Sequence, residues 1–425
     1  MALEPGLVII LLLVLLVSGV PIAIALGLSG ALGLWLMDFP LLIVIQRMTA
    51  GTESFVLLAI PFFILSGTIM EFGGLSRRLV NFADAAVGFL PGGLANANIG
   101  ASMVFGGISG SSVADTSAVG SVMIPQMERQ GYSQRFSAAV TAASSPIGMI
   151  VPPSIPMIVW SFVSGQSLNE LFLAGLLPGV LIGVVLMAVS TSLCMAHGFQ
   201  ARLGAFSLRR LAVGTWDGLL ALGAPGIIIV GIVSGQFTPT EASVIATAYA
   251  LVVTMGVYRE LGWRDLPGIL MRAGRMAASI MFVVATATVF SFFLTVAGLP
   301  QIVNGLFHAY ATTPLLFMLL ACLMLFVCGM FLDTTTTILM IGPILYPLIG
   351  HYDIDPLVAT MVFLIVLAVG LVTPPVGLCL FVVSTLVPVR IMEVARTCIP
   401  FIIGMLLVAA AIWVFPGLVT WGRAS

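Results

Sequence analysis

Two aspartates, Asp115 and Asp333, stand in the middle of long apolar segments, where a charged side chain is costly and usually serves a function. Each begins a run that is rich in hydroxyl groups, over 115–117 and over 333–337. Carboxylates, hydroxyls and backbone carbonyls supply the hard oxygen atoms that a Na⁺ ion would take. Asp, Ser and Thr are also common helix N-caps, which is the competing interpretation. Both roles can coincide, because a helix N-terminus inside a membrane attracts a substrate carboxylate while nearby carbonyls hold a cation.

The surroundings of the two aspartates occur twice along the chain. Matching residues are separated by 218 positions (Asp115 and Asp333, Pro125 and Pro343) or by 222 (Gly148 and Gly370, and the Pro-Pro pairs at 152–153 and 374–375). The spacing predicts an internal duplication, with a first repeat over 1–215 and a second over 216–425. In a membrane protein, repeats that carry Gly/Pro interruptions at corresponding places indicate a transporter whose site lies between the repeats.

Composition defines the class of protein. Of the 425 residues, 60% are hydrophobic and 7% are charged, and the mean hydropathy of +1.22 is typical of an integral membrane protein. Every basic residue is an arginine. A P-loop needs a lysine, so we expect energy to come from an ion gradient or a partner. The net charge of −1 and the absence of a basic run argue against nucleic acid.

Apolar segments of about 20 residues predict an all-α polytopic protein with about ten spans. We place the spans at roughly 6–20, 22–37, 54–72, 136–163, 171–196, 217–235, 240–257, 277–296, 356–388 and 398–418. Two further segments, 92–127 and 315–348, are too long for one helix and too short for two crossings, which predicts re-entrant hairpins. Their tips would expose backbone at membrane depth, where it must line a cavity or be buried in protein. The N-terminal run has no basic leader and is expected to be a retained span.

Arginine placement predicts that the repeats are inverted. The loop after the first hairpin and the connectors 197–215 and 258–276 are arginine-rich and should be cytoplasmic, whereas the loop after the second hairpin has none. Arg47 and Arg423 run against this rule. Three short amphipathic segments, 75–90, 263–276 and 299–312, suit helices that lie in the membrane interface and frame a moving part.

The spans 136–163 and 356–388 must be broken, because the prolines within them remove backbone donors. A single proline kink would be structural, but paired breaks that follow paired hairpins favour a site. We assign substrate contacts to the hydroxyl residues Ser109, Ser111, Ser154, Thr335 and Thr336. We assign the coupling cations to Gly107, Ser112, Asp115, Ser144, Ser145, Gly148, Gly329, Asp333, Thr334, Gly370 and Thr373.

The first hairpin also carries a specific resemblance. The run Gly107-Ile108-Ser109-Gly110-Ser111-Ser112-Val113-Ala114-Asp115-Thr116, with Met123–Met127 and Val151–Ser154 after it, resembles the large membrane subunit (DctM/SiaM type) of the tripartite ATP-independent periplasmic (TRAP) transporters, within the ion-transporter superfamily. The resemblance implies an inner-membrane, elevator-type importer of an organic acid (a C4-dicarboxylate, sialic acid or similar carboxylate) that is coupled to two or more Na⁺ ions. It also implies two partners, a small four-helix membrane subunit (DctQ type) and a periplasmic substrate-binding protein (DctP type).

Three other classes compete with this interpretation. A stand-alone Na⁺-coupled dicarboxylate carrier of the same superfamily is the main alternative. An intramembrane aspartyl protease also uses two membrane aspartates, but its second motif is Gly-x-Gly-Asp, and here Met330-Phe331-Leu332 precedes Asp333. A purely structural subunit gives no reason for paired polar tips. We therefore expect a transporter and not an enzyme, with a substrate that the sequence does not name.

Overall fold

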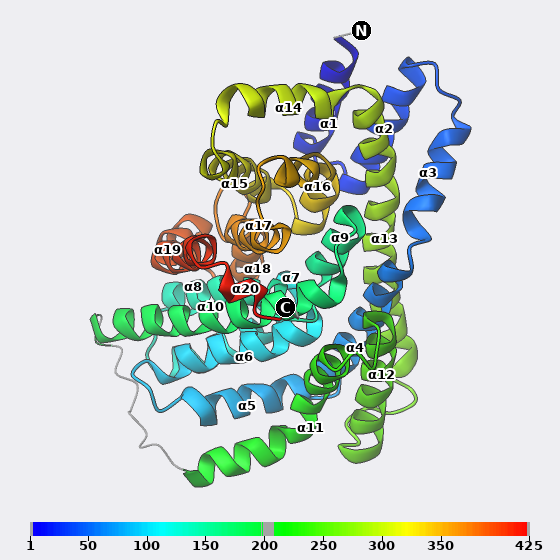
Figure 1. Ribbon diagram of the computed structural model, residues 1–425. Coiled ribbons are helices and arrows are strands. Elements are labelled where there is room, and N and C mark those ends of the chain that lie inside the picture. The colour runs from blue at the N-terminus through cyan, green and yellow to red at the C-terminus, as the bar shows by residue number, and fades with distance from the viewer. Residues whose placement is uncertain (1–2, 197, 199–207, 423–425) are drawn as a thin grey trace.

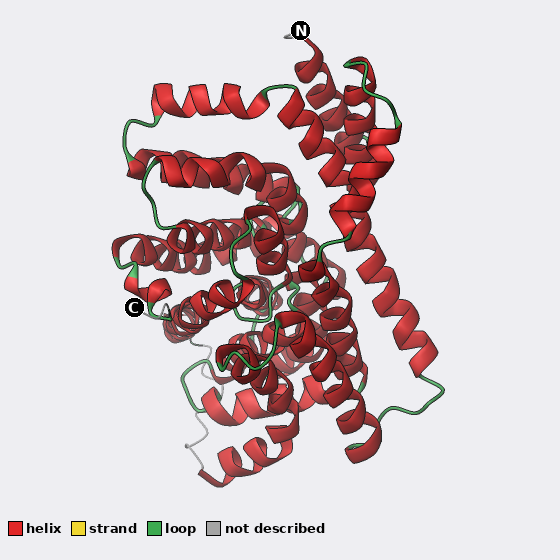
Figure 2. Ribbon diagram, turned by 45° about the vertical axis from the view of Figure 1, so that its right-hand side comes forward, coloured by secondary structure: helices red, strands yellow, loops and turns green. Residues whose placement is uncertain are grey.

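The computed structural model describes residues 3–196, 198 and 208–422, and within these ranges the chain is helical with no β-strand. An apolar chain in lipid must satisfy its backbone groups within each segment, which the α-helix does. Figures 1 and 2 show two groups of helices lying side by side, joined by two short helices that run across the gap between them.

The first group, which we call the frame, is organised around the long helix α13. It contains α1 (Leu3–Val17), α2 (Ile22–Leu36), α3 (Leu42–Thr52), α4 (Ala59–Phe72), α11 (Leu208–Val233), α12 (Pro239–Leu251) and α13 (Leu266–Val296). Helix α13 packs against α2, α3 and α4, while α12 packs against α4 and α11. Helix α3, which the sequence did not predict, extends along α13 in Figure 1.

The second group, which we call the core, contains two helical hairpins and two broken helices. From the first half of the chain come α6 (Gly93–Ser109), α7 (Ser112–Arg129), α8 (Gln134–Ser144), α9 (Ile155–Ser164) and α10 (Leu168–Ala196). From the second half come α15 (Pro314–Phe331), α16 (Thr334–His351), α17 (Pro356–Gly370), α18 (Leu378–Leu386), α19 (Ile391–Val414) and the short α20 (Gly417–Thr420). The predicted hairpins and breaks are therefore present as helix pairs and interrupted helices.

The two groups are connected by α5 (Leu75–Val87) and α14 (Leu299–Tyr310). Each begins after a glycine with positive φ, Gly74 (73°) and Gly298 (75°). Both were predicted as separate amphipathic segments, and both are separate helices. The same prediction was wrong for 263–276, because α13 runs without a break from Leu266 to Val296 and so absorbs most of that segment. The connecting elements are thus α5 and α14.

Helix boundaries set the register of the two halves and correct one sequence alignment. Helices α7 and α16 are both 18 residues long, and they begin and end 222 positions apart. The same offset relates the positive-φ residues Gly131 and Asp353 that follow them, and the N-caps of α8 and α17. Asp333 therefore corresponds to Ser111, and Asp115 to Thr337, so the 218-residue pairing of the two aspartates was wrong by about one helical turn. The sequence-based pairing matched Pro125 with Pro343. However, α16 carries a second proline, Pro347, and this one lies at the position that corresponds to Pro125.

Among the residues that the structure describes, six helices are long and apolar enough to cross a membrane: Phe55–Phe72, Leu168–Ala196, Pro239–Val257, Leu266–Val296, Pro314–Phe331 and Ile391–Val414. Five of them fall on predicted spans. The sixth is α15, the first half of the second predicted hairpin, whose 18 residues extend about 27 Å at 1.5 Å per residue. The four hairpin helices are each 17 or 18 residues long. The remaining predicted spans are shorter apolar helices or the two broken ones.

Candidate functional site

The tips of both hairpins line one cavity of about 200 Å³. Its lining comes from the first tip (Gly110, Ser111, Ser112, Val113), the second tip (Asp333, Thr334, Thr335), the segments around the two breaks (Met149, Ile155, Pro156, Leu371, Leu378) and the frame (Ile280). The volume lies below the roughly 300–1,000 Å³ of clefts that hold drug-sized ligands, so it suits a small ligand. The presence of Ile280 from α13 places the cavity at the border between core and frame.

The first tip is a tight turn held against the break of its own half. Gly110 adopts φ 59°, and a Cβ at this position would lie 3.0 Å from the Ile155 nitrogen and 3.1 Å from the Pro153 oxygen. Ser111 then caps α7, its hydroxyl accepting the Ala114 N–H at 3.4 Å. Glycine is needed here because both the positive φ and the close backbone approach exclude a side chain.

The turn of the second tip, Leu332 and Asp333, has no glycine and is held by a carboxylate. Asp333 caps α16, accepting the Thr336 N–H at 3.2 Å, and it also accepts the Thr336 hydroxyl. The Asp333 carbonyl accepts the Thr337 hydroxyl at 3.0 Å. Asp333 is partly exposed and lines the cavity, so it caps the helix and also faces the space where a ligand would sit.

Paired glycines bring each hairpin into backbone contact with the break beside it. A Cβ at Gly148 would lie 2.5 Å from the Gly106 Cα, and one at Gly370 would lie 2.7 Å from the Gly329 carbonyl carbon. A Cβ at Gly107 would lie 3.1 Å from the Pro152 oxygen. Close packing therefore explains the glycines that the sequence assigned to cations. Any role for them in binding an ion would come from their carbonyls.

The second break is also tied to its hairpin by hydrogen bonds. The N–H groups of Val376 and Gly377 both donate to the Met330 carbonyl at 3.3 Å. The Thr373 hydroxyl donates to the Val369 carbonyl at 2.8 Å and stays partly exposed inside the break. The tip and the break thus form one unit in each half of the chain.

Asp115 is fully buried, one turn inside α7. Neither of its carboxylate oxygens accepts a hydrogen bond from any residue that the structure describes, and the Ser112 hydroxyl is likewise unpartnered there. The hydroxyls of Ser145 and Ser102 lie beside the carboxylate. Ser145 donates to the Thr141 carbonyl at 2.8 Å, so its oxygen remains free to act as a ligand.

A buried charge without a partner is strongly unfavourable, so this carboxylate requires a cation or a proton. The surrounding hydroxyl and carboxylate oxygens are ligands of the hard type that Na⁺ takes. Sequence reasoning missed Ser102, which lies on α6 and accepts a hydrogen bond from Ser144 at 3.1 Å. A polar residue that shares a helix face with the tip glycines was the only signal that could have identified it.

The residues that the sequence assigned to cations and substrate therefore lie in two places in the structure, and a few lie in neither. Ser112, Ser144 and Ser145 lie near Asp115, whereas Gly329, Thr334, Gly370 and Thr373 belong to the second tip and its break. Of the proposed substrate contacts, Ser111 and Thr335 line the cavity. Ser109, Ser154 and Thr336 do not line it.

The three residues outside the cavity lining have local partners instead. Ser154 caps α9, accepting the Met157 N–H at 3.3 Å and donating to the Met149 carbonyl at 2.5 Å. Thr336 is turned towards Asp333. The Ser109 hydroxyl lies 3.4 Å from the Ser111 nitrogen within the first turn. Helix capping and turn geometry, the competing interpretation of these residue types, therefore accounts for them.

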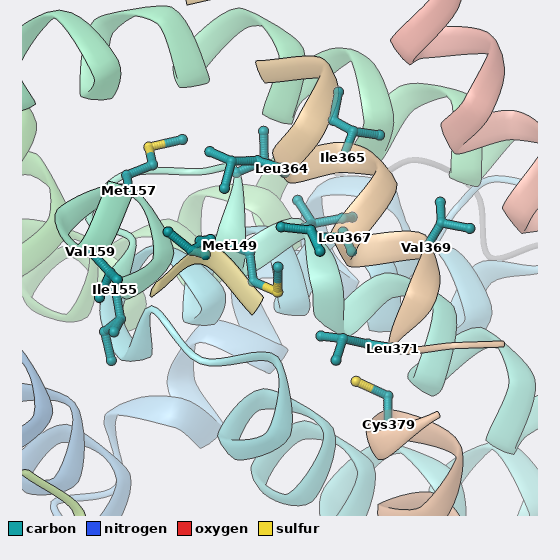
Figure 3. Close-up of a cluster of buried hydrophobic side chains, with 14 of the residues drawn as sticks. Met149, Ile155, Met157, Val159, Leu364, Ile365, Leu367, Val369, Leu371 and Cys379 are labelled. Atoms are coloured by element: carbon teal, nitrogen blue, oxygen red, sulfur yellow. The ribbon is translucent and has the colours of Figure 1, made fainter. Parts of the chain in front are cut away.

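The two halves close around the cavity in a crosswise manner. Helix α9 packs against α16, and α18 packs against α7, so each hairpin meets the short helix that follows the break in the other half. Figure 3 shows Met149 and Ile155 from the first half, and Leu367 and Leu371 from the second half, as members of one cluster of buried apolar side chains. Of these residues, Met149, Ile155 and Leu371 also line the cavity.

Comparison with known proteins gives one family over nearly the whole chain. Residues 9–418 match the family described as tripartite ATP-independent periplasmic transporter, DctM component. A putative TRAP transporter large permease protein from Haemophilus influenzae is 40% identical over 408 residues, covering 94% of both chains. The 2,3-diketo-L-gulonate TRAP transporter large permease protein YiaN from Escherichia coli is 37% identical, covering 91% of both.

Among solved structures, the crystal structure of the Alcanivorax borkumensis YdaH transporter is similar, with a TM-score of 0.58 and 14% identity. The match covers 89% of this chain and 87% of that one. At this identity the likeness concerns the fold alone.

Proposed function

Since the chain belongs to the DctM family of tripartite ATP-independent periplasmic transporters, as the large permease type, we propose that it imports a small organic acid together with Na⁺. It is a transport component and not an enzyme, and it is a multi-pass protein of the inner membrane, which borders the periplasm. The observation that carries the proposal is the shared cavity, because the tips of both hairpins reach it from separate halves of the chain.

The cavity favours a carboxylate substrate. The first residues of α7 and of α16 both line it, so two helix N-termini face the same space. A helix N-terminus carries about half a positive charge and unsatisfied N–H groups, which stabilise an anion. A dicarboxylate could present one carboxylate to each terminus. A C4-dicarboxylate, sialic acid or a similar carboxylate fits this arrangement, and the relative from Escherichia coli is named for the sugar acid 2,3-diketo-L-gulonate.

Asp333 supplies a physical reason for coupling to Na⁺. Its carboxylate lines the same cavity and would repel a substrate anion. A cation held at the second tip by Asp333, the Thr334 hydroxyl and the carbonyls of the break would offset that charge. A second cation would neutralise Asp115. Carboxylate binding would then depend on Na⁺, and the two negative charges, one buried and one facing the cavity, would account for at least two coupling ions.

Transport would follow from movement of the core against the frame. We place the two inverted repeats at 1–215 and 216–425, with the hairpins entering from opposite faces, as the arginine distribution indicates. Because Ile280 of α13 completes a cavity that otherwise belongs to the core, displacement of the core would open or close the site. Helices α5 and α14 connect the two groups and are positioned to absorb such an elevator motion.

The proposed assembly includes a small membrane subunit of the DctQ type and a periplasmic substrate-binding protein of the DctP type, as the word tripartite in the family description indicates. Reconstitution in liposomes tests the proposal. With an inward Na⁺ gradient, uptake of the acid should require all three components, and replacing Na⁺ by K⁺ should abolish it. Full-rate uptake by this chain alone would instead support the stand-alone dicarboxylate carrier.

A further inference from the structure

A second groove, of about 390 Å³, lies between the start of α8, the end of α10 and the start of α19. In Figure 1 this region is on the side of the core away from α13. Its lining is Ser133, Arg135, Phe136, Leu193, Arg396, Thr397 and Pro400, none of which lines the central cavity. The transport site therefore does not account for this groove.

The groove offers an anion two guanidinium groups from different helices. Arg135 lies 3.9 Å from Glu393, and both side chains are well exposed, so this ion pair is weak and leaves guanidinium donors available. Within the part of the chain that the structure describes, no carboxylate lies within ion-pairing distance of Arg396. Ser133 caps α8, so the N-terminus of that helix also faces the groove. A phosphate monoanion suits this set of donors.

The remainder of the groove is apolar, which favours an amphipathic ligand over a free anion. Phe136, Leu193 and Pro400 line it. Beyond Pro400, α19 presents an exposed apolar stripe, with Ile399, Ile403 and Leu407 each at least half exposed. These positions are four residues apart and therefore lie on one face of the helix. A ligand with its phosphate between the arginines could lay its hydrocarbon chains along this stripe.

We infer that this groove binds the headgroup of an anionic phospholipid. The loop before α8 is one of those predicted to be cytoplasmic, and the cytoplasmic leaflet carries the anionic lipids that basic pockets between membrane helices attract. The inference rests on the membrane location of the chain and does not depend on the proposed coupling to Na⁺. Its failure would leave the proposed function intact.

Lipid binding to the purified chain in detergent provides the test. Native mass spectrometry would measure the apparent affinity for phosphatidylglycerol and for phosphatidylcholine. In the double variant Arg135→Gln/Arg396→Gln, binding of phosphatidylglycerol should weaken about 25-fold, roughly fivefold for each arginine removed. The matched control Arg264→Gln/Arg275→Gln removes two exposed arginines from the other group of helices and should bind phosphatidylglycerol like the parent. Phosphatidylcholine binding should be the same in all three proteins.

Two outcomes would overturn the inference. One is equal phosphatidylglycerol binding by the double variant and its control. The other is displacement of the lipid by millimolar inorganic phosphate, which would show that the groove selects a free anion. If the double variant does not fold, the single variant Arg396→Gln, at an exposed position, should still weaken binding about fivefold. No change in that variant would equally contradict the inference.

Discussion

Helices α7 and α16 of the two hairpins have the same length and register, but the aspartates of the two hairpins lie in opposite environments. In the first hairpin, α6 is buried along almost its whole length, and Asp115 is sealed one turn inside α7 without a hydrogen-bond donor among the described residues. In the second, α15 is largely exposed, and Asp333 is a partly exposed N-cap with donors from Thr336. The two hairpins thus carry their aspartates at different positions, one buried inside α7 and the other partly exposed at the residue before α16. Under the proposed function, the first aspartate would need a cation or a proton for its burial, whereas the second would need a cation before an anion could bind beside it.

The largest effect should come from Asp115→Asn, which keeps the shape of the side chain and removes the buried charge. Loss of a cation ligand should lower Na⁺-driven uptake at least about 100-fold, or about 2.7 kcal/mol. In Na⁺-free buffer the variant should be more stable than the parent, because an unpaired buried charge is unfavourable. Thermal unfolding with and without NaCl checks this. A variant that Na⁺ stabilises as much as it stabilises the parent would mean that Asp115 holds no cation.

The glycine contacts should have the next largest effect, and it should be equal in the two halves. Gly148→Ala and Gly370→Ala each place a methyl group within 2.7 Å of the partner backbone, which should destabilise the protein by about 1–3 kcal/mol. Gly226→Ala in α11 is the matched control, because a Cβ there has nothing within 4 Å. Thermal unfolding of the three variants makes the comparison. If Gly148→Ala or Gly370→Ala unfolds at the same temperature as the control, the close backbone contact is not needed.

Asp333 offers a way to separate helix capping from ion binding. Asparagine caps as well as aspartate does, so Asp333→Asn should leave stability nearly unchanged, whereas Asp333→Ala should lose about 1 kcal/mol. Both should raise the Na⁺ concentration for half-maximal uptake about tenfold, because both remove the carboxylate. Uptake measured across a range of Na⁺ concentrations checks this. An unchanged Na⁺ dependence in Asp333→Asn would mean that Asp333 acts only as a helix cap.

The smallest effect should distinguish two neighbouring threonines. Thr335 lines the cavity, whereas Thr336 is buried and hydrogen-bonded to Asp333. Thr335→Val should therefore raise KM for the acid about three- to tenfold at unchanged stability, since it removes one hydrogen bond to the ligand. Thr336→Val should mainly lower the thermal unfolding temperature. The opposite pattern would show that α16 turns a different face to the ligand.

Sequence reasoning located the hairpins and breaks because proline, glycine and polar residues stand out against an apolar background. It failed where tertiary packing determines the helix boundaries and the direction of a side chain. The amphipathic pattern of 263–276 could not show that α13 continues through it, and α3 lacks a long apolar run. Within the site, residue type could not separate hydroxyls that face the cavity, such as Ser111, from those that cap a helix, such as Ser154. The sequence offered only a weak signal for Ser102, its place on one helix face with the tip glycines, and the fold is what brings α6 beside Asp115.

Equilibrium binding of radioactive Na⁺ to the purified chain would test most directly whether the two aspartates hold separate cations. The parent should bind at least two ions that K⁺ does not displace. Asp115→Asn should lose one ion while the site at the second tip remains, and Asp333→Asn should lose or weaken the other. Equal Na⁺ binding by the parent and both variants, or full displacement by K⁺, would contradict the assignment of one cation to each hairpin.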